Sequence, residues 1–208
     1  SEQELLLAAW AIILQSYRDG HAAIEAFDFY SVQKSHLQEA FDLLSTPLGQ
    51  VNSTLANLRY QIRAVLAPYD FTGQLEELQS IALGNIMLPQ QELEYGILLY
   101  QGNRSKEASR QFGKLRRMWR DNDYFVHVPT RLRWLFEQET GQRRVVRAVV
   151  DDSGFKAQAK VMAFENQLVP FRPEEFGFRR PVHGQQLQAY VTFFRSGPFL
   201  RPLSDNDD

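Results

Sequence analysis

Cysteine is absent from this chain of 208 residues, and histidine occurs only four times. Without cysteine the chain can form no disulfide, thiolate zinc site, iron–sulfur cluster or cysteine nucleophile. The four histidines and the carboxylates are then the only candidates for metal ligands or general bases. We therefore expect no metal site and no cofactor.

Long hydrophobic runs are also missing. The longest is LLLAAWAIIL, from Leu5 to Leu14, which falls far short of the roughly 20 apolar residues that span a bilayer as a helix. Acidic residues precede it, where a secretory signal would have basic ones. The run therefore predicts a buried helix, and we expect a cytoplasmic protein without a membrane partner. The first residue is Ser1 and not methionine, which indicates processing, a tag remnant or a piece of a longer polypeptide.

Catalytic motifs are lacking as well. The sequence contains no glycine-rich phosphate loop, paired-histidine metal motif or nucleophile elbow. His127, with Asp123 nearby in the sequence, could do general acid–base work. The alternative is a histidine that packs between helices and bonds a backbone carbonyl. Because no second histidine or carboxylate converges on His127, the sequence predicts that the protein is not an enzyme.

Charge is distributed unevenly, although the formal net charge is only −2. Residues 1–100 carry a charge of −8, residues 101–150 carry +7 and residues 151–208 carry −1. Such segregation creates a local positive potential in an acidic protein. The basic segment is a solvated helix face, a surface that docks on the acidic half of the same fold, or a site for an anionic partner.

An anion site would use cations that recur at helical spacing. Arg110, Lys114 and Arg117 share one helix stripe, which Lys106 extends by a turn. Arginine forks suit phosphate, and interleaved aromatics such as Trp119 and Trp134 suit single-stranded nucleic acid; the alternative for these two is core packing. The predicted nucleic-acid or anion-binding residues are Arg104, Lys106, Arg110, Lys114, Arg117, Arg120, Arg131, Arg133, Arg143 and Arg144.

Helical patterns fill the chain as far as about residue 142. Apolar residues three and four apart, with glycine and proline at intervals, indicate several antiparallel helices joined by short turns. The predicted helices lie near residues 2–19, 21–45, 47–67, 72–86, 89–102, 104–122 and 128–140.

The segment ELEYGILLYQGNRSKEASRQFGKLRRMWR carries the most specific helical pattern. Small residues at Gly96 and Ala108 would let two antiparallel helices approach closely, with Phe112 and Leu115 filling the groove. The segment resembles one tetratricopeptide repeat, which has a small residue in its first helix and alanine followed by an aromatic in its second. The resemblance covers about 34 residues and implies a superhelical array of hairpins.

After Gly141 the pattern changes to short runs rich in valine, phenylalanine and tyrosine: RRVVRAVV, KAQAKVMAF, NQLVPFR and LQAYVTFF, with FLRPL closing the barrel or sheet. Such runs predict a small β-rich unit. The strings KVMAF, FRPEEFGF and HGQQLQAYVTFFRSGPFL resemble, distantly, a cold-shock or OB-type barrel. The two aromatic boxes by which that family binds RNA are absent.

The sequence thus predicts an α+β protein. An α-helical, tetratricopeptide-like hairpin array occupies residues 1–142, a small OB-like barrel or sheet follows over residues 143–203, and an acidic disordered tail ends the chain at residues 204–208. We expect a non-catalytic interaction module, part of a larger bacterial protein or complex, whose helical array docks a protein partner. The alternative is a single-stranded nucleic-acid-binding module that uses the basic residues 104–147 and the β domain.

Overall fold

The computed structural model describes residues 1–22, 28–48, 52–84, 87–121, 126–138, 140–151 and 156–204, with backbone alone at 53 and 119–121. Its contacts divide the chain into two compact units, Ser1–Met87 and Leu88–Asp208. The division falls between two helices, whereas the sequence analysis places the boundary after residue 142. The described residues confirm an α+β protein in which helices come first and a sheet follows.

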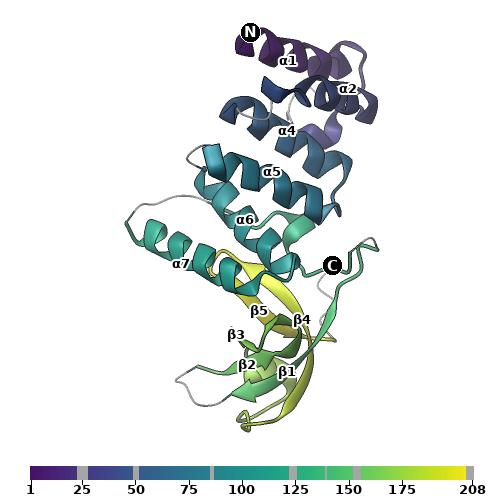
Figure 1. Cartoon of the computed structure of the whole chain (residues 1–208). Helices are drawn as coiled ribbons and strands as arrows, with labels where there is room; N and C mark the ends of the chain where they lie inside the picture. The colour runs from purple at the N-terminus through teal and green to yellow at the C-terminus, as the bar shows by residue number, and fades with distance from the viewer. Residues whose placement is uncertain are drawn as a thin grey trace. The chain divides into compact units, whose positions relative to one another are not determined.

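The described residues of the first unit form α-helices and one short 3₁₀ turn (Figure 1). Its elements are α1 (Glu2–Arg18), η1 (Phe29–Ser31), α2 (Lys34–Leu44), α4 (Ser53–Leu66) and α5 (Phe71–Gly84). The side chain of Ser1 caps α1, and that of Asn52 caps α4 by accepting hydrogen bonds from the amides of the first turn. Ile13, Leu37 and Leu55, from three different helices, are fully buried in one apolar core.

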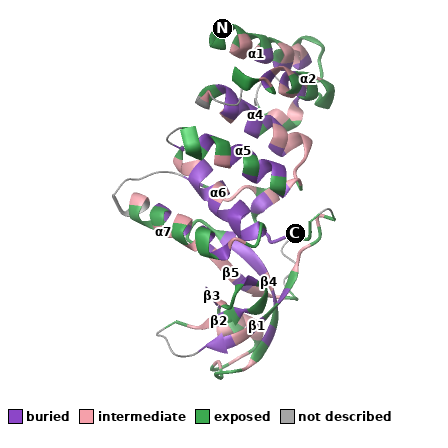
Figure 2. Cartoon of the chain, in the orientation of Figure 1, coloured by how far each residue is buried: buried purple, intermediate pink, exposed green. Residues whose placement is uncertain are grey.

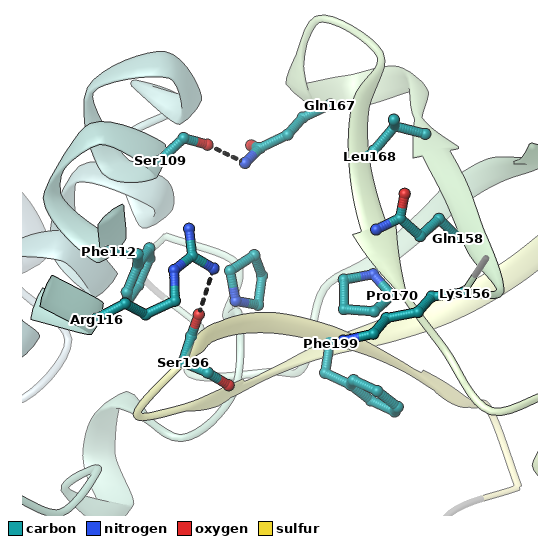
Figure 3. Close-up of a pocket in the computed structure, with 11 residues that line it drawn as sticks. Ser109, Phe112, Arg116, Lys156, Gln158, Gln167, Leu168, Pro170, Ser196 and Phe199 are labelled. Carbon is teal, nitrogen blue, oxygen red and sulfur yellow. Dashed lines mark hydrogen bonds between the residues drawn. The ribbon is translucent and has the colours of Figure 1, made fainter. Parts of the chain in front are cut away.

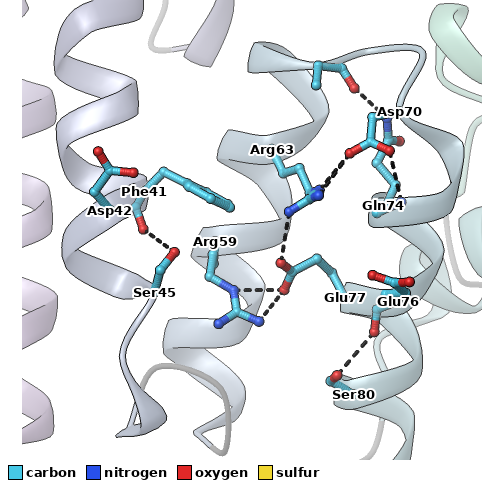
Figure 4. A network of polar contacts seen from close by, with 12 residues as sticks. Phe41, Asp42, Ser45, Arg59, Arg63, Asp70, Gln74, Glu76, Glu77 and Ser80 are labelled. Carbon is cyan, nitrogen blue, oxygen red and sulfur yellow. Dashed lines mark hydrogen bonds and ion pairs between the residues drawn. The ribbon is translucent and has the colours of Figure 1, made fainter. Parts of the chain in front are cut away.

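Buried charges join α4 to α5 in this unit (Figure 4). The guanidinium of Arg59 donates to the carboxylate of Glu77, at 2.7 Å from Nε, and both side chains are buried. Arg63 donates to the second oxygen of Glu77 at 3.5 Å and to Asp70 at 2.8 Å. Asp70 in turn accepts the amide hydrogen of Gly73 in the first turn of α5, at 3.0 Å. The helix pair is therefore held by an ionic network as well as by apolar packing.

The second unit begins with a helical hairpin, α6 (Pro89–Gln101) and α7 (Ser105–Asp121). Pro89 occupies the first turn of α6, where its missing N–H costs nothing. A Cβ atom at Gly96 would lie 3.3 Å from the ring of Phe112 on α7. The close approach of the two helices that the sequence predicts is thus present, with Ala108, Phe112 and Leu115 buried at the contact.

An antiparallel sheet completes the second unit (Figure 1). Its strands are β1 (Val145–Asp151), β2 (Gln158–Val161), β3 (Gln167–Pro170), β4 (Gln186–Phe194) and β5 (Gly197–Pro202), in the spatial order β3-β2-β1-β4-β5. A parallel bridge from Phe171 to Leu200 joins the two ends of the sheet. The sheet therefore curls into a partly closed barrel.

Tyr100 of α6 is a core residue that the hairpin and the sheet share. Its ring lies 4.3 Å from that of Phe164 and 5.5 Å from that of Phe193, measured between centroids, and all three side chains are buried. Nearly every residue of α6 is buried (Figure 2). The hairpin thus supplies part of the hydrophobic core of the sheet, which explains why both belong to one unit.

Two predicted helices need correction. The structure has no helix over residues 128–140 except the 3₁₀ turn η2 (Thr130–Leu132). The next residues run beside β4, because the amide of Leu135 donates to Val191 at 2.9 Å and the amide of Phe193 donates to Arg133 at 2.8 Å. In the predicted helix 21–45, η1 precedes α2, while residues 23–27 lie outside the described ones, as do residues 49–51 of the predicted helix 47–67.

Further 3₁₀ turns follow β2 and β3 in the second unit. They are η3 (Met162–Phe164) and η4 (Pro173–Phe176). The run KAQAKVMAF, predicted as one strand, therefore divides into β2 and η3. Residues 205–208 of the predicted acidic tail lie outside the described residues.

Candidate functional site

The outer face of α1 is apolar and exposed, although the sequence predicts a buried helix. Leu7 is 69% exposed and Leu14 is 49% exposed, and Ala8 and Ala11 between them are exposed as well. Only one face of α1, which includes Ala9 and Ile13, is buried. We call Leu7, Ala8, Ala11 and Leu14 the α1 stripe. The prediction failed because ten apolar residues in a row hide which face of the helix packs.

The predicted basic residues of the hairpin lie close to acids of the same unit. Lys106 pairs with Glu165 at 2.8 Å, and Arg104 pairs with Glu107 at 2.6 Å. Lys114 pairs with the buried carboxylate of Glu92. These contacts neutralise part of the charge that the sequence assigns to an anionic partner.

The hydrogen bond from Arg104 and the positive charges of Arg104 and Arg110 lower the pKa of Glu107. Arg110 and Arg117 are exposed on α7 and form no ion pair with the described residues. The side chain of Arg120 lies outside the described ones. Of the predicted α7 stripe, Arg110 and Arg117 thus remain the charges most open to an external anion.

Four predicted arginines lie between the hairpin and the sheet or along β4. Arg131 pairs with the buried Glu94 at 2.8 Å. Arg144 donates to the side chain of Asn103 at 3.1 Å. Arg143 stacks 3.9 Å from the ring centre of Trp134, and Arg133 lies 5.9 Å from the same ring. The structure brings Arg133 and Arg143 together, while it places Arg131 and Arg144 in separate contacts.

His127 belongs to the segment that follows the hairpin. Its side chain is exposed, and its backbone amide and carbonyl both bond the side chain of Gln90. Asp123, its proposed partner, lies outside the described residues. Among the residues that the structure describes, no group of three or more histidines, aspartates and glutamates could hold a metal ion.

A pocket of about 400 Å³ lies between α7 and the strands β2, β3 and β5 (Figure 3). Arg116 and Lys156 contribute two cations, and Gln158 and Gln167 contribute amides. The remaining lining residues are small or apolar: Ser109, Phe112, Leu168, Pro170, Ser196, Pro198 and Phe199. None of these eleven residues is an aspartate or glutamate.

Sequence reasoning missed this pocket because its cations come from distant segments. Arg116 lies outside the predicted stripe of α7, and Lys156 precedes a strand that is recognisable only by its alternation. Arg116 and Lys156 line the same pocket because α7 packs on the sheet, and no local sequence pattern predicts that packing.

Comparisons with protein-family models, with curated proteins and with solved structures found no match to this chain. Within its described part, no helix combines the length and the apolar character needed to cross a membrane.

Proposed function

We propose that the protein is a non-catalytic interaction module and that its helical unit docks an amphipathic helix of a protein partner on the α1 stripe. The observation that carries this proposal is the exposure of Leu7 and Leu14 on the face of α1 opposite the one that packs through Ala9 and Ile13. Isolated exposed leucines are common on proteins, but a contiguous apolar stripe is a feature of interaction surfaces.

The shape of the stripe suits a helix. Residues 7, 11 and 14 follow one another at spacings of four and three, so they lie along one side of α1. Two alanines separate the two leucines, and small side chains at the centre allow a second helix to approach to about 8 Å between axes. The leucines would then pack on both sides of the partner helix.

The charge of the unit indicates the kind of helix. Residues 1–87 contain four lysines and arginines against ten aspartates and glutamates. Opposite charge speeds association and disfavours wrong partners. The expected partner helix therefore carries lysine or arginine beside its apolar face.

Affinity capture from host cells with matched variants tests the proposal. The double variant Leu7→Asp/Leu14→Asp in the full chain should capture at least tenfold less of the partner than the wild type. Leu83→Asp is the control, because Leu83 is 91% exposed in the same unit but lies on α5. Equal loss in both variants, or none in either, would contradict docking on the stripe.

Circular dichroism and size-exclusion chromatography with light scattering accompany the capture. Unchanged helicity shows that the variants fold. A wild-type dimer that the double variant converts to a monomer would identify a second copy as the occupant, which also contradicts the proposed partner.

A second candidate is a module that binds single-stranded nucleic acid. The strand order β3-β2-β1-β4-β5, with the ends joined at Phe171 and Leu200, favours it because that order is similar to OB-type barrels. Filter binding of single-stranded DNA and RNA at two salt concentrations tests it. Phosphate contacts predict a steep loss of affinity with salt, whereas no retention at low salt would eliminate this function.

A further inference from the structure

The pocket between α7 and the sheet has the charge of an anion site. Arg116 reaches it from α7 and Lys156 from the segment before β2, and no lining residue carries a negative charge (Figure 3). Among the described residues, Arg116 makes one hydrogen bond, a long one of 3.5 Å to the carbonyl oxygen of Ser196. Arg104, in contrast, donates twice to the carboxylate of Glu107.

The pocket also has a flat apolar surface and polar groups that can recognise a ligand. Pro170, Pro198 and Phe199 supply the apolar part. Gln158 projects its amide into the same space (Figure 3). Gln167 donates to the hydroxyl of Ser109, while its Oε1 atom is buried without a hydrogen-bond partner among the described residues. Because this atom has almost no accessible surface, the amide of Gln158 is the group that a ligand in the pocket can reach.

An added peptide strand does not fit this place. Pro170 and Pro198 stand on the two strands that border the pocket, and proline has no N–H to donate to a neighbouring strand. We therefore expect side chains to supply the main contacts to a ligand. The volume of about 400 Å³ lies within the range of small-molecule sites.

We propose that this pocket binds one 5′-phosphorylated nucleotide unit, with its phosphate between Arg116 and Lys156 and its base against Pro170 and Phe199. A phosphate monoester carries a charge of about −1.5 to −2 at neutral pH, which two cations match. Arginine binds phosphate through paired hydrogen bonds. The amide of Gln158 offers both a donor and an acceptor to the edge of a base.

Calorimetric titration of the full chain with nucleoside monophosphates tests the proposal. At least one of the four common monophosphates should bind, and the matching nucleoside and inorganic phosphate should each bind at least tenfold more weakly. An oligonucleotide with a 5′ phosphate should bind better than the same strand without it. Tighter binding of the strand than of the free nucleotide would identify a strand end as the source.

Two charge reversals locate the site. Arg116→Glu and Lys156→Glu should each weaken binding at least tenfold. Arg180→Glu is the matched control, because Arg180 is exposed in the same unit but does not line the pocket. Thermal unfolding of each variant shows whether it folds. If Arg116→Glu does not fold, Lys156→Glu still tests the site.

Three results would overturn the proposal: no binding of any monophosphate, equal binding of inorganic phosphate, or equal loss in Arg180→Glu. None of them bears on the α1 stripe, which belongs to the other unit.

Discussion

The two helical hairpins α4–α5 and α6–α7 are joined in different ways. In the first, Arg59 and Glu77 form a buried ion pair at the contact between the helices. In the second, Gly96 lets the helices approach closely and α6 contributes Tyr100 to the aromatic core of the sheet. A buried ion pair stabilises the contact only when both charged partners are present, whereas aromatic packing depends on the fit of apolar surfaces. We call the first contact the charged joint and the second the aromatic joint. Substitutions should therefore act differently in the two units.

The largest effect is expected from Glu77→Ala. It leaves Arg59 buried without its main partner, and breaking a buried pair in this way costs about 3–5 kcal/mol. Chemical denaturation should show this loss, and amide hydrogen exchange should place it in α4 and α5. Glu76→Ala, an exposed neighbour on the same helix, is the control and should change stability little. Equal effects of the two variants would show that the charged joint does not hold the hairpin.

A gain is expected from Tyr100→Phe in the second unit. The hydroxyl of Tyr100 is buried without a hydrogen-bond partner among the described residues, and burial raises the pKa of its phenol well above the ordinary value. Removing a buried unsatisfied polar group while keeping the ring should stabilise the protein by about 1 kcal/mol. Thermal and chemical unfolding measure the change. Destabilisation would mean that the joint depends on this hydroxyl as well as on apolar fit.

The smallest effect is expected at the surface of the second hairpin. Glu107→Gln removes an exposed ion pair with Arg104, which contributes less than about 1 kcal/mol. Because the pKa of Glu107 is lowered in the folded state, its contribution is present above the unfolded pKa. It is lost as the pH falls through the folded value. Wild type and variant should differ slightly at neutral pH and converge in acid, and a difference that persists in acid would contradict this origin.

The sequence predicted the positions of helices and strands better than the contacts between them. Helix and strand periodicity located α4 to α7 and the strands β1 to β4, because those signals are local, while FLRPL, which is expected to close the sheet, forms most of β5. The pattern around Trp134 predicts a helix, and this prediction is wrong. The segment is extended because its backbone bonds to β4, and these bonds cannot be read from the local sequence. The shared core at Tyr100 depends in the same way on contacts between segments that are distant in the sequence.

The candidate sites show the same difference between local and distant contacts. The basic stretch was visible in the sequence, but the acids that pair with it at Glu92, Glu94 and Glu165 could not be assigned to it without a fold. The pocket around Arg116 and Lys156 escaped sequence analysis for that reason. The α1 stripe escaped it because uniform apolar character does not reveal which face of a helix is covered.

Site-specific photo-cross-linking in host cells tests the central claim, that a partner helix docks on the α1 stripe, most directly. A photoreactive phenylalanine replaces Leu7, Leu14 or Leu83 in turn in the full chain, and mass spectrometry identifies the adducts and the cross-linked peptides. We predict that Leu7 and Leu14 cross-link to one and the same protein, within a peptide of basic amphipathic character, and that Leu83 does not. Adducts of equal yield at all three positions, or none at Leu7 and Leu14, would contradict the claim.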